Sequence, residues 1–261
     1  MNQNQNKTVV KSMQILNLFI DHERLSLQEI VLKTNLPKTS AHRMVLSLEE
    51  MGFLSKDEQG KYGLGLLFLQ FGHLVAERLD IRKVALPVMQ RLKEELGEAV
   101  NLVVRDGDEA IYIEKVDTSE RVRVYTQIGR RAPLYGGACP RILLAHLPEE
   151  KQNRYVDKVE IVPYAMNTIV DKEELRRVLK ECRDRGYSVS HSELENYSSA
   201  AGAPIFNHMG ELVAGLSVVG PEVRFQDHEH LQKCIEKVKE AAREISTALG
   251  YKAGNDKGGV N

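Results

Sequence analysis

The sequence lacks the patterns by which several classes of protein are recognised. No stretch approaches the run of about 18 apolar residues that a membrane-spanning helix needs, and the amino terminus has no apolar signal core, so we expect a cytoplasmic protein. The three cysteines lie far apart without a CxxC spacing, which argues against a disulfide framework and a zinc site. G-x-G-x-x-G, Walker A and H-E-x-x-H motifs are missing too, so we expect neither a metal nor another cofactor.

An excess of charge of one sign is also missing. The 36 lysines and arginines nearly balance the 37 aspartates and glutamates, which gives a formal net charge of −1. The field of the whole protein therefore gives no support for nucleic-acid binding, and a DNA-packaging protein with a broad basic surface is disfavoured. Any case for DNA binding has to come from a local surface.

The composition is that of an ordinary globular protein, with 42% hydrophobic and 28% charged residues. A length of 261 residues suits one large or two modest domains. The Asn/Gln-rich start, residues 1–6, and the Gly-rich tail, residues 252–261, are expected to lack fixed structure.

The first helical signal is a set of apolar residues at helical spacing from Val9 to Ile20, which predicts a helix with a broad apolar face. Ser26-Leu27-Gln28-Glu29 then has the pattern of a capping box. In that motif the serine hydroxyl accepts from the glutamate amide while the glutamate carboxylate returns to the serine amide. A second, short helix should begin there.

A tight corner follows the second helix. Asn35 tolerates the left-handed conformation that closes a helix. Pro37 disfavours helix at Leu36 and suits the first turn of a third helix, which we expect to begin at Lys38. Two helices joined by so short a turn form a helix-turn-helix.

The third helix separates an apolar face, with Ala41, Val45, Leu48 and Met51, from a polar one. Its candidate DNA-binding residues are Lys38, Thr39, Ser40, His42 and Arg43, which can neutralise phosphate, donate to the backbone or bind a guanine edge. No acidic residue occurs between Ile30 and Leu48. A solvated helix face with no ligand would have the same pattern, so the next segment decides.

That segment predicts a hairpin: residues 52–56, the polar turn 57–60, then residues 61–64. A hairpin directly after a recognition helix is the wing of a winged helix, with Lys56 and Lys61 placed to contact the DNA backbone. Asp57 and Glu58 lie between them. We therefore expect the wing to position the protein and the third helix to provide specificity.

The remainder predicts an α+β domain. Apolar helices are expected at 66–75 and 84–96. The first is too apolar to stand alone in water, which favours packing against a second copy of the chain or the wing domain.

Asp106-Gly107 predicts a tight hairpin in the second domain. Expected strands are 100–104, 110–113, 122–125, 187–191, 203–206 and 212–219, and expected helices are 142–146, 149–156, 172–185 and 228–249, with Asp171 and Asp227 as caps. This order favours an antiparallel sheet with flanking helices, an arrangement that resembles the GAF or profilin-like architecture.

The segments Leu36–Arg43, Gly52–Leu54 and Tyr62–Gly65, together with Leu48, resemble the IclR family of bacterial regulators, and the likeness continues through the second half. The resemblance implies a winged helix-turn-helix at 1–65, a linker helix at 66–80, an effector-binding domain at 81–251 and the tail at 252–261. It also implies a homodimer or homotetramer on a near-palindromic double-stranded operator, repressing a metabolic operon in response to a small molecule.

The segment from Gly129 to Arg141 is the candidate effector loop. Its small residues and Pro140 precede an apolar helix, so the backbone amides of Gly137, Ala138 and Cys139 should be exposed at a helix start, where a carboxylate or sugar acid can bind.

The family resemblance implies that this loop lines the effector pocket, opposite contacts from Ser190, Ser198 and Ala200. Tyr135 stands where the family usually has histidine, and Pro140-Arg141 where it has Gly-Lys. Ser190 replaces an acid of some relatives and Ala200 a cysteine, which implies a roomier, less charged pocket. The alternative for these side chains is simple packing under the sheet.

An enzyme is the competing interpretation. Cys139 could be a nucleophile, with His146 or His191 as base and Glu193 or Glu195 orienting it. A lone glycine-flanked cysteine is weak evidence, and Cys182 and Cys234 lie on apolar helical stripes typical of inert packing. We therefore expect a regulator and no catalytic residues.

Overall fold

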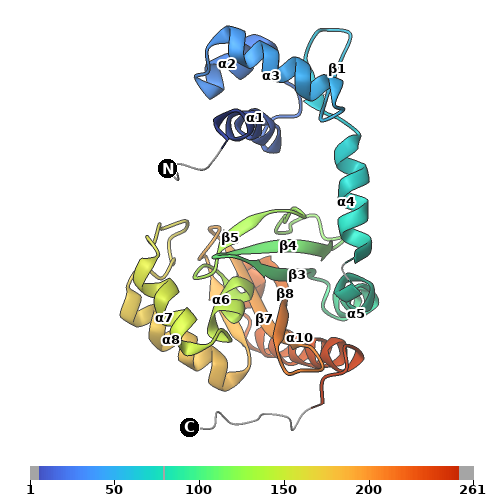
Figure 1. Ribbon diagram of the computed structural model, residues 1–261. Coiled ribbons are helices and arrows are strands. Elements are labelled where there is room, and N and C mark those ends of the chain that lie inside the picture. Colours follow the sequence, from blue (N-terminus) through green and yellow to red (C-terminus); the bar gives the residue numbers. More distant parts are fainter. Residues whose placement is uncertain (1–5, 79, 253–261) are drawn as a thin grey trace. The chain divides into compact units, whose positions relative to one another are not determined.

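The computed structural model describes residues 6–78 and 80–252, and the chain divides after residue 79 into two compact units (Figure 1). The expected linker range is occupied by α4 (Leu67–Arg78). The expected disorder of residues 1–5 and 253–261 lies outside the described residues. Asn6 contradicts its assignment to a structureless start, because its side chain caps α1 by accepting from the amides of Thr8 and Val9.

The first unit is a three-helix core with a two-stranded wing. Its elements are α1 (Lys7–Asn17), the 3₁₀ turn η1 (Leu18–Ile20), α2 (Leu27–Thr34), α3 (Lys38–Glu50), β1 (Leu54–Lys56), β2 (Tyr62–Leu64) and α4. The capping box forms as predicted: the Glu29 amide donates to Ser26 Oγ at 3.3 Å, and the Ser26 amide donates to Glu29 Oε2 at 2.8 Å. Asn35 closes α2 in the left-handed region with φ 54°.

The broad buried face predicted for the first helix is wrong at its amino-terminal half. Ile15 and Leu16 are buried in α1, whereas Val9 and Met13 are 59% and 49% exposed. Only the last turns of α1 reach the small core of this unit, which also holds Ile30, Ala41 and Val45, so the earlier apolar residues have nothing to cover them.

The second unit is a six-stranded antiparallel sheet between two layers of helices. The strands are β3 (Ala99–Asp106), β4 (Glu109–Val116), β5 (Arg131–Pro133), β6 (Ser188–His191), β7 (Ser198–Phe206) and β8 (Leu212–Pro221), in the order β5-β4-β3-β8-β7-β6. The helices are α5 (Asp80–Leu96), α6 (Ala138–Ala145), α7 (Glu149–Lys158), α8 (Lys172–Arg185), α9 (Glu222–Phe225) and α10 (His228–Ala248). Alternate side chains of each strand therefore face different helices.

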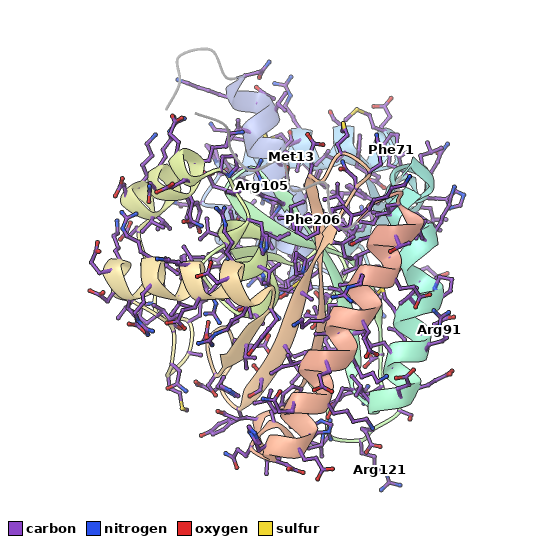
Figure 2. All side chains as sticks on the ribbon, turned by 90° about the horizontal axis from the view of Figure 1, so that it is seen from below. Met13, Phe71, Arg91, Arg105, Arg121 and Phe206 are labelled. Carbon is purple, nitrogen blue, oxygen red and sulfur yellow. The ribbon has the colours of Figure 1, made fainter. Side chains whose placement is uncertain are left out.

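The helices are divided between the two faces of this sheet. α5 and α10 pack on one face and against each other, and the exposed pair Arg91–Glu244 links them (Figure 2). α6 packs on the other face, with α8 over it. The predicted caps are confirmed: Asp171 accepts from the Glu174 amide at 2.7 Å, and Asp227 from the Glu229 amide at 3.0 Å.

Two predicted strands in this unit need correction, and α5 and α6 begin at Asp80 and Ala138, four residues before the expected starts at 84 and 142. Residues 122–125 form no strand; the edge beside β4 is taken by β5, where Ala132 pairs with Ala110. Alternating apolar and polar residues form a strand only where a neighbouring strand supplies the backbone hydrogen bonds. β7 begins at Ser198 rather than Ala203, because residues 198–202 pair with β8 and residues 199–202 also pair with β6. A Cβ on Gly202 would lie 3.4 Å from the Cys139 backbone, so α6 packs closely on this part of the strand.

No helix among residues 6–78 and 80–252 is long and apolar enough to cross a membrane.

Candidate DNA-binding surface and effector cavity

The helix α3 has the two faces that the sequence predicts, except that Met51, expected on the apolar face, follows the helix and is 54% exposed. Ala41, Val45 and Leu48 are buried against α1 and α2, while Lys38, Thr39, His42 and Arg43 are exposed and Ser40 is half-buried. None of the three basic side chains has a carboxylate partner among the described residues, and the first turn of α3 contains no acid. The positive end of the helix dipole adds to this charge. The surface is therefore suited to phosphate and base edges.

The wing is fixed to the core by a third strand-like segment. The amide of Leu25 donates to the Tyr62 carbonyl at 2.9 Å, and the Tyr62 amide donates back at 2.8 Å. Lys56 and Lys61 are exposed on this hairpin. Asp57 accepts from the amides of Gln59 and Lys61, at 3.0 and 2.9 Å, so this acid shapes the turn.

A small cavity lies between α6 and the sheet, and we call it the inner cavity. It has a volume of about 40 Å³. Six of the seven predicted effector residues line it, from three separate segments: Gly137, Ala138 and Cys139 at the start of α6, Ser190 on β6, and Ser198 and Ala200 on β7. Its small volume contradicts the expected roomy pocket.

Several other lining residues were missed: Asn101, Tyr112, Thr126, Arg130, Leu194, Glu195 and Ser217. A signal existed for two of them. Asn101 interrupts an apolar strand between Val100 and Leu102, and Ser217 does the same between Leu216 and Val218. Polar residues in an otherwise apolar strand indicate that the sheet face they lie on is not packed with apolar side chains alone.

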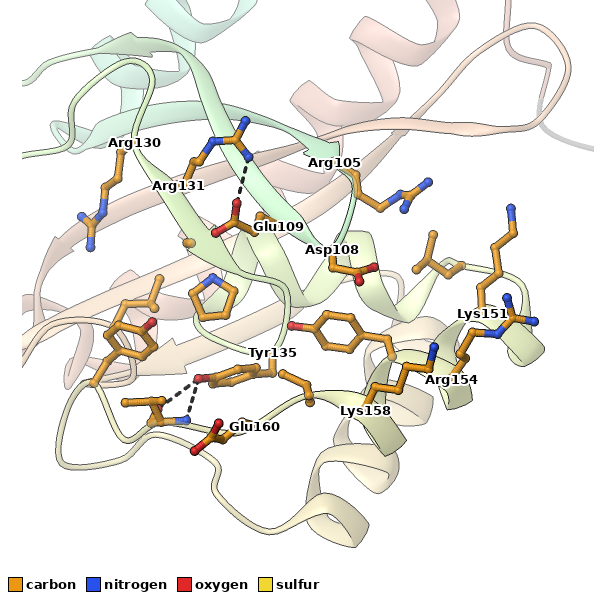
Figure 3. A pocket seen from close by; sticks show the side chains of 18 residues that line it. Arg105, Asp108, Glu109, Arg130, Arg131, Tyr135, Lys151, Arg154, Lys158 and Glu160 are labelled. Carbon is orange, nitrogen blue, oxygen red and sulfur yellow. Dashed lines mark hydrogen bonds and ion pairs between the residues drawn. The ribbon is translucent and has the colours of Figure 1, made fainter. Parts of the chain in front are cut away.

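The seventh predicted residue, Tyr135, does not line the inner cavity. It lies in a second pocket of about 530 Å³, the outer pocket, which is formed by residues of β4, β5, α7 and the segment 159–164 (Figure 3). The Tyr135 hydroxyl donates to the Val162 carbonyl at 3.1 Å and accepts from the Val162 amide at 2.9 Å. Burial raises its pKa above the ordinary value.

The backbone amides predicted to be open for a carboxylate are largely occupied. The Gly137 amide donates to Glu193 Oε2 at 3.1 Å, and the Ala138 amide donates to Ser190 Oγ at 3.0 Å. Glu193 also accepts from Arg141 Nη1 at 2.6 Å, and both side chains are buried. The protein's own carboxylate thus fills the predicted acid site. The Cys139 amide has no acceptor among the described residues.

The loop 192–197 closes the inner cavity. Leu194 lies so close to the backbone of Gly136 and Gly137 that a Cβ on either would approach it to 2.7 and 2.9 Å. Gly137 also has φ 79°, which favours glycine. Glu195 forms an ion pair with Arg130, so the loop is attached at two points.

Cys139 is not arranged as a nucleophile. Burial raises the pKa of its thiol to about 12, and the Ser217 side chain opposes this shift. The Nδ1 atom of His146 contacts the Ile142 carbonyl and that of His191 contacts Ser199 Oγ, at 2.9 and 2.8 Å. Neither candidate base serves Cys139.

Comparison with known proteins identifies both units. Residues 8–58 match the IclR helix-turn-helix domain, and residues 73–247 match the family described as bacterial transcriptional regulator IclR C-terminal. The chain belongs to the IclR family. It is 55% identical over 249 residues to the HTH-type transcriptional regulator KipR of Bacillus subtilis, covering 95% of this chain and 99% of KipR.

Two further IclR-type proteins are similar over most of their length. The HTH-type transcriptional repressor AllR of Escherichia coli K12 is 31% identical over 229 residues, covering 87% of this chain and 84% of AllR. The crystal structure of an IclR homolog from Microbacterium hydrocarbonoxydans, complexed with 4-hydroxybenzoate, matches with a TM-score of 0.82 and 27% identity, covering 93% of this chain and 99% of that one.

These relatives are regulators that carry the helix-turn-helix found here. The protein is accordingly a DNA-binding transcriptional regulator of the IclR family and not an enzyme.

Proposed function

We propose that the protein is an effector-responsive repressor that binds a near-palindromic operator as a homodimer or homotetramer in the cytoplasm. The observation that carries the DNA-binding part is the exposed face of α3, where Lys38, His42 and Arg43 lie without a carboxylate partner among the described residues. The name of AllR supports repression.

Self-association is supported by apolar side chains that the first unit leaves uncovered. Val9 and Met13 on α1 and Leu69 and Phe71 on α4 are exposed. Exposed apolar patches of this kind mark protein interfaces. A dimer would present two copies of α3 to successive major grooves, one helical turn apart.

Within the proposed DNA interface, Arg43 would contact a base edge, and Lys38, Thr39, Ser40 and His42 would contact phosphates or bases near the start of α3. Lys56 and Lys61 would contact the backbone from the wing. Loss of a good bidentate contact to guanine costs about 1–3 kcal/mol of discrimination against the wrong base.

The effector would bind in the inner cavity, against Gly137, Ala138, Cys139, Ser190, Ser198 and Ala200. The bound 4-hydroxybenzoate of the Microbacterium protein supports a small organic acid, and a carboxylate or sugar acid fits the polar lining. Tyr135 would act from outside the cavity, because it is part of the outer pocket. Binding would change operator affinity by a coupling free energy of about 1–3 kcal/mol.

The DNA-binding part is tested without any ligand. An operator is selected from a random DNA library, and affinity is measured by fluorescence anisotropy at fixed salt. Arg43→Ala should weaken binding about tenfold or more and relax the base preference at one position, whereas Lys61→Ala should weaken all sequences alike. An Arg43→Ala protein that binds like the wild type would overturn the assignment of α3.

The sensor part is tested with a bulky substitution in the cavity. Ser190→Trp should abolish the effector response and leave operator affinity unchanged in the absence of effector. Ser199→Ala is the matched control: Ser199 follows Ser198 on β7 and, from strand alternation, faces away from the cavity. Normal induction of the Ser190→Trp protein would place the effector elsewhere.

A further inference from the structure

The walls of the inner cavity are polar but mostly uncharged. Asn101, Ser190, Ser198 and Ser217 come from four different strands and line the same space. The charged residues that line it, Arg130 and Glu195, are paired with each other; their side chains are 29% and 42% exposed, so they lie at its solvent side. The deep part of the cavity therefore selects by hydrogen bonds rather than by charge.

Most of these polar groups already have a partner. The Ser190 hydroxyl accepts from the Ala138 amide, and the Ser198 hydroxyl donates to the Glu195 carbonyl at 2.8 Å. The Asn101 amide nitrogen donates to Thr126 Oγ1 at 3.5 Å.

The carbonyl oxygen of Asn101 is the exception. The residue is 2% exposed, and its Oδ1 atom is the one buried side-chain oxygen or nitrogen without a hydrogen-bond partner within residues 6–74 and 81–252. Buried polar groups in folded proteins almost always have a partner, so an orphan acceptor that lines a cavity needs an explanation. An acceptor in this position requires a donor from whatever fills the cavity.

A second group points to the same ligand. Cys139 also lines the cavity, and its backbone amide has no acceptor among the described residues, while the preceding amides of Gly137 and Ala138 are occupied. The Asn101 carbonyl thus offers an acceptor, and the Cys139 amide a donor, that no other group of the described residues uses. A complementary molecule carries a hydroxyl or N–H group and an oxygen acceptor.

We infer that Asn101 determines effector specificity by accepting a hydrogen bond, and that the effector is a small hydroxy acid or hydroxy amide rather than the corresponding deoxy or keto compound. The inference rests on the proposed sensor role of this cavity. A site built to bond a hydroxyl discriminates strongly against the analogue without it, because the buried polar group is then left unpaired. No contact of Asn101 with DNA is involved.

The test uses the full-length protein and pairs of probes that differ in one group: lactate with propionate, lactate with pyruvate, and glycolate with acetate. Binding is measured by isothermal titration calorimetry and by thermal shift, since a ligand of the folded state raises its stability. In the wild type the hydroxy member of each pair should bind about tenfold more tightly, the size expected from one hydrogen bond.

Asn101→Leu has a similar shape without the acceptor, so it should bind the two members of each pair about equally. Asn101→Asp retains the acceptor and should keep the preference for the hydroxy member. Ser199→Ala should leave the preference unchanged, and circular dichroism should show that each variant is folded. Equal binding of the paired acids to the wild type, no binding of any hydroxy probe, or a full preference in Asn101→Leu would each overturn the inference. The ligand-free operator assay with Arg43→Ala tests the proposed function separately, so the two failures are distinguishable.

Discussion

The two faces of the six-stranded sheet are built from different chemistry. The face under α5 and α10 is apolar at alternate positions, with Leu102, Leu216 and Val218 fully buried. On the opposite face, under α6, the intervening positions of the same strands are Asn101 and Ser217, both lining the inner cavity. One face is thus a hydrophobic core, and the other combines a smaller core with a polar network. Under the proposed function, this difference would separate stability from ligand recognition within a single sheet.

The largest expected effect is on the polar face. Glu193→Ala would leave Arg141 buried and without its carboxylate, and breaking a buried ion pair in this way costs about 3–5 kcal/mol. The free energy of unfolding, measured in urea, should fall by that amount. Glu193→Gln is the control: it keeps the acceptor for the Gly137 amide and should lose less. Equal losses for the two variants would show that the acceptor kept by glutamine contributes nothing, and no loss for Glu193→Gln would show that charge is unimportant here.

A smaller loss is expected on the apolar face. Leu216→Ala removes a fully buried side chain from the core beneath α10, which costs about 2–5 kcal/mol depending on how far the cavity collapses. Urea unfolding measures the loss. The preference for hydroxy acids should be unchanged in the folded variant, because Leu216 faces away from the inner cavity. A changed preference would mean that the two faces are not independent.

Alkaline pH should affect both faces alike. Burial raises the pKa of the Cys139 thiol, on α6, and of the Cys234 thiol, on α10, from 9.0 to about 12. The folded protein therefore keeps these protons after the unfolded chain has lost them. Stability should be full below pH 9 and fall as the pH rises toward 12, by about 1.4 kcal/mol per pH unit for each thiol.

Urea unfolding at several pH values between 8 and 11 measures this slope. Cys139→Ala and Cys234→Ala should each reduce it by the same amount, whichever face the thiol belongs to. If neither substitution changes the slope, the loss of stability at alkaline pH comes from other groups, such as Tyr112, whose pKa burial also raises.

The smallest expected effects come from the helix caps on the two faces. Asp171→Ala at α8 and Asp227→Ala at α10 each remove one exposed capping hydrogen bond, which costs about 1 kcal/mol. Thermal unfolding should show similar losses for both. A much larger loss for one of them would mean that its helix limits the stability of the whole unit.

What the sequence predicted well was local. The capping box at Ser26, the left-handed Asn35 and the caps of α8 and α10 each depend on residues within a few positions of one another. Such signals determine helix ends with little help from the rest of the fold. The helix-turn-helix and its wing followed from them.

The parts that could not be predicted depend on distant pairs. Glu193 and Arg141 are 52 residues apart, and nothing near either residue indicates that one would fill the site expected for a ligand. The edge strand β5 was missed for a related reason, because a three-residue strand is defined by its partner β4 rather than by its own pattern. The pocket residues came from the family resemblance, and only the fold shows that Tyr135 is separate from them.

Glu193 also bears on the concentration at which the sensor responds. An acidic effector that uses the Gly137 amide first has to displace a resident carboxylate that is covalently part of the protein and is always present. The apparent affinity is then lower than the intrinsic affinity by the fraction of molecules in which Glu193 has moved away. In the proposed sensor, such an internal competitor would set a threshold: trace amounts of an acid would leave the regulator unchanged, and only a metabolite that has accumulated would produce a response.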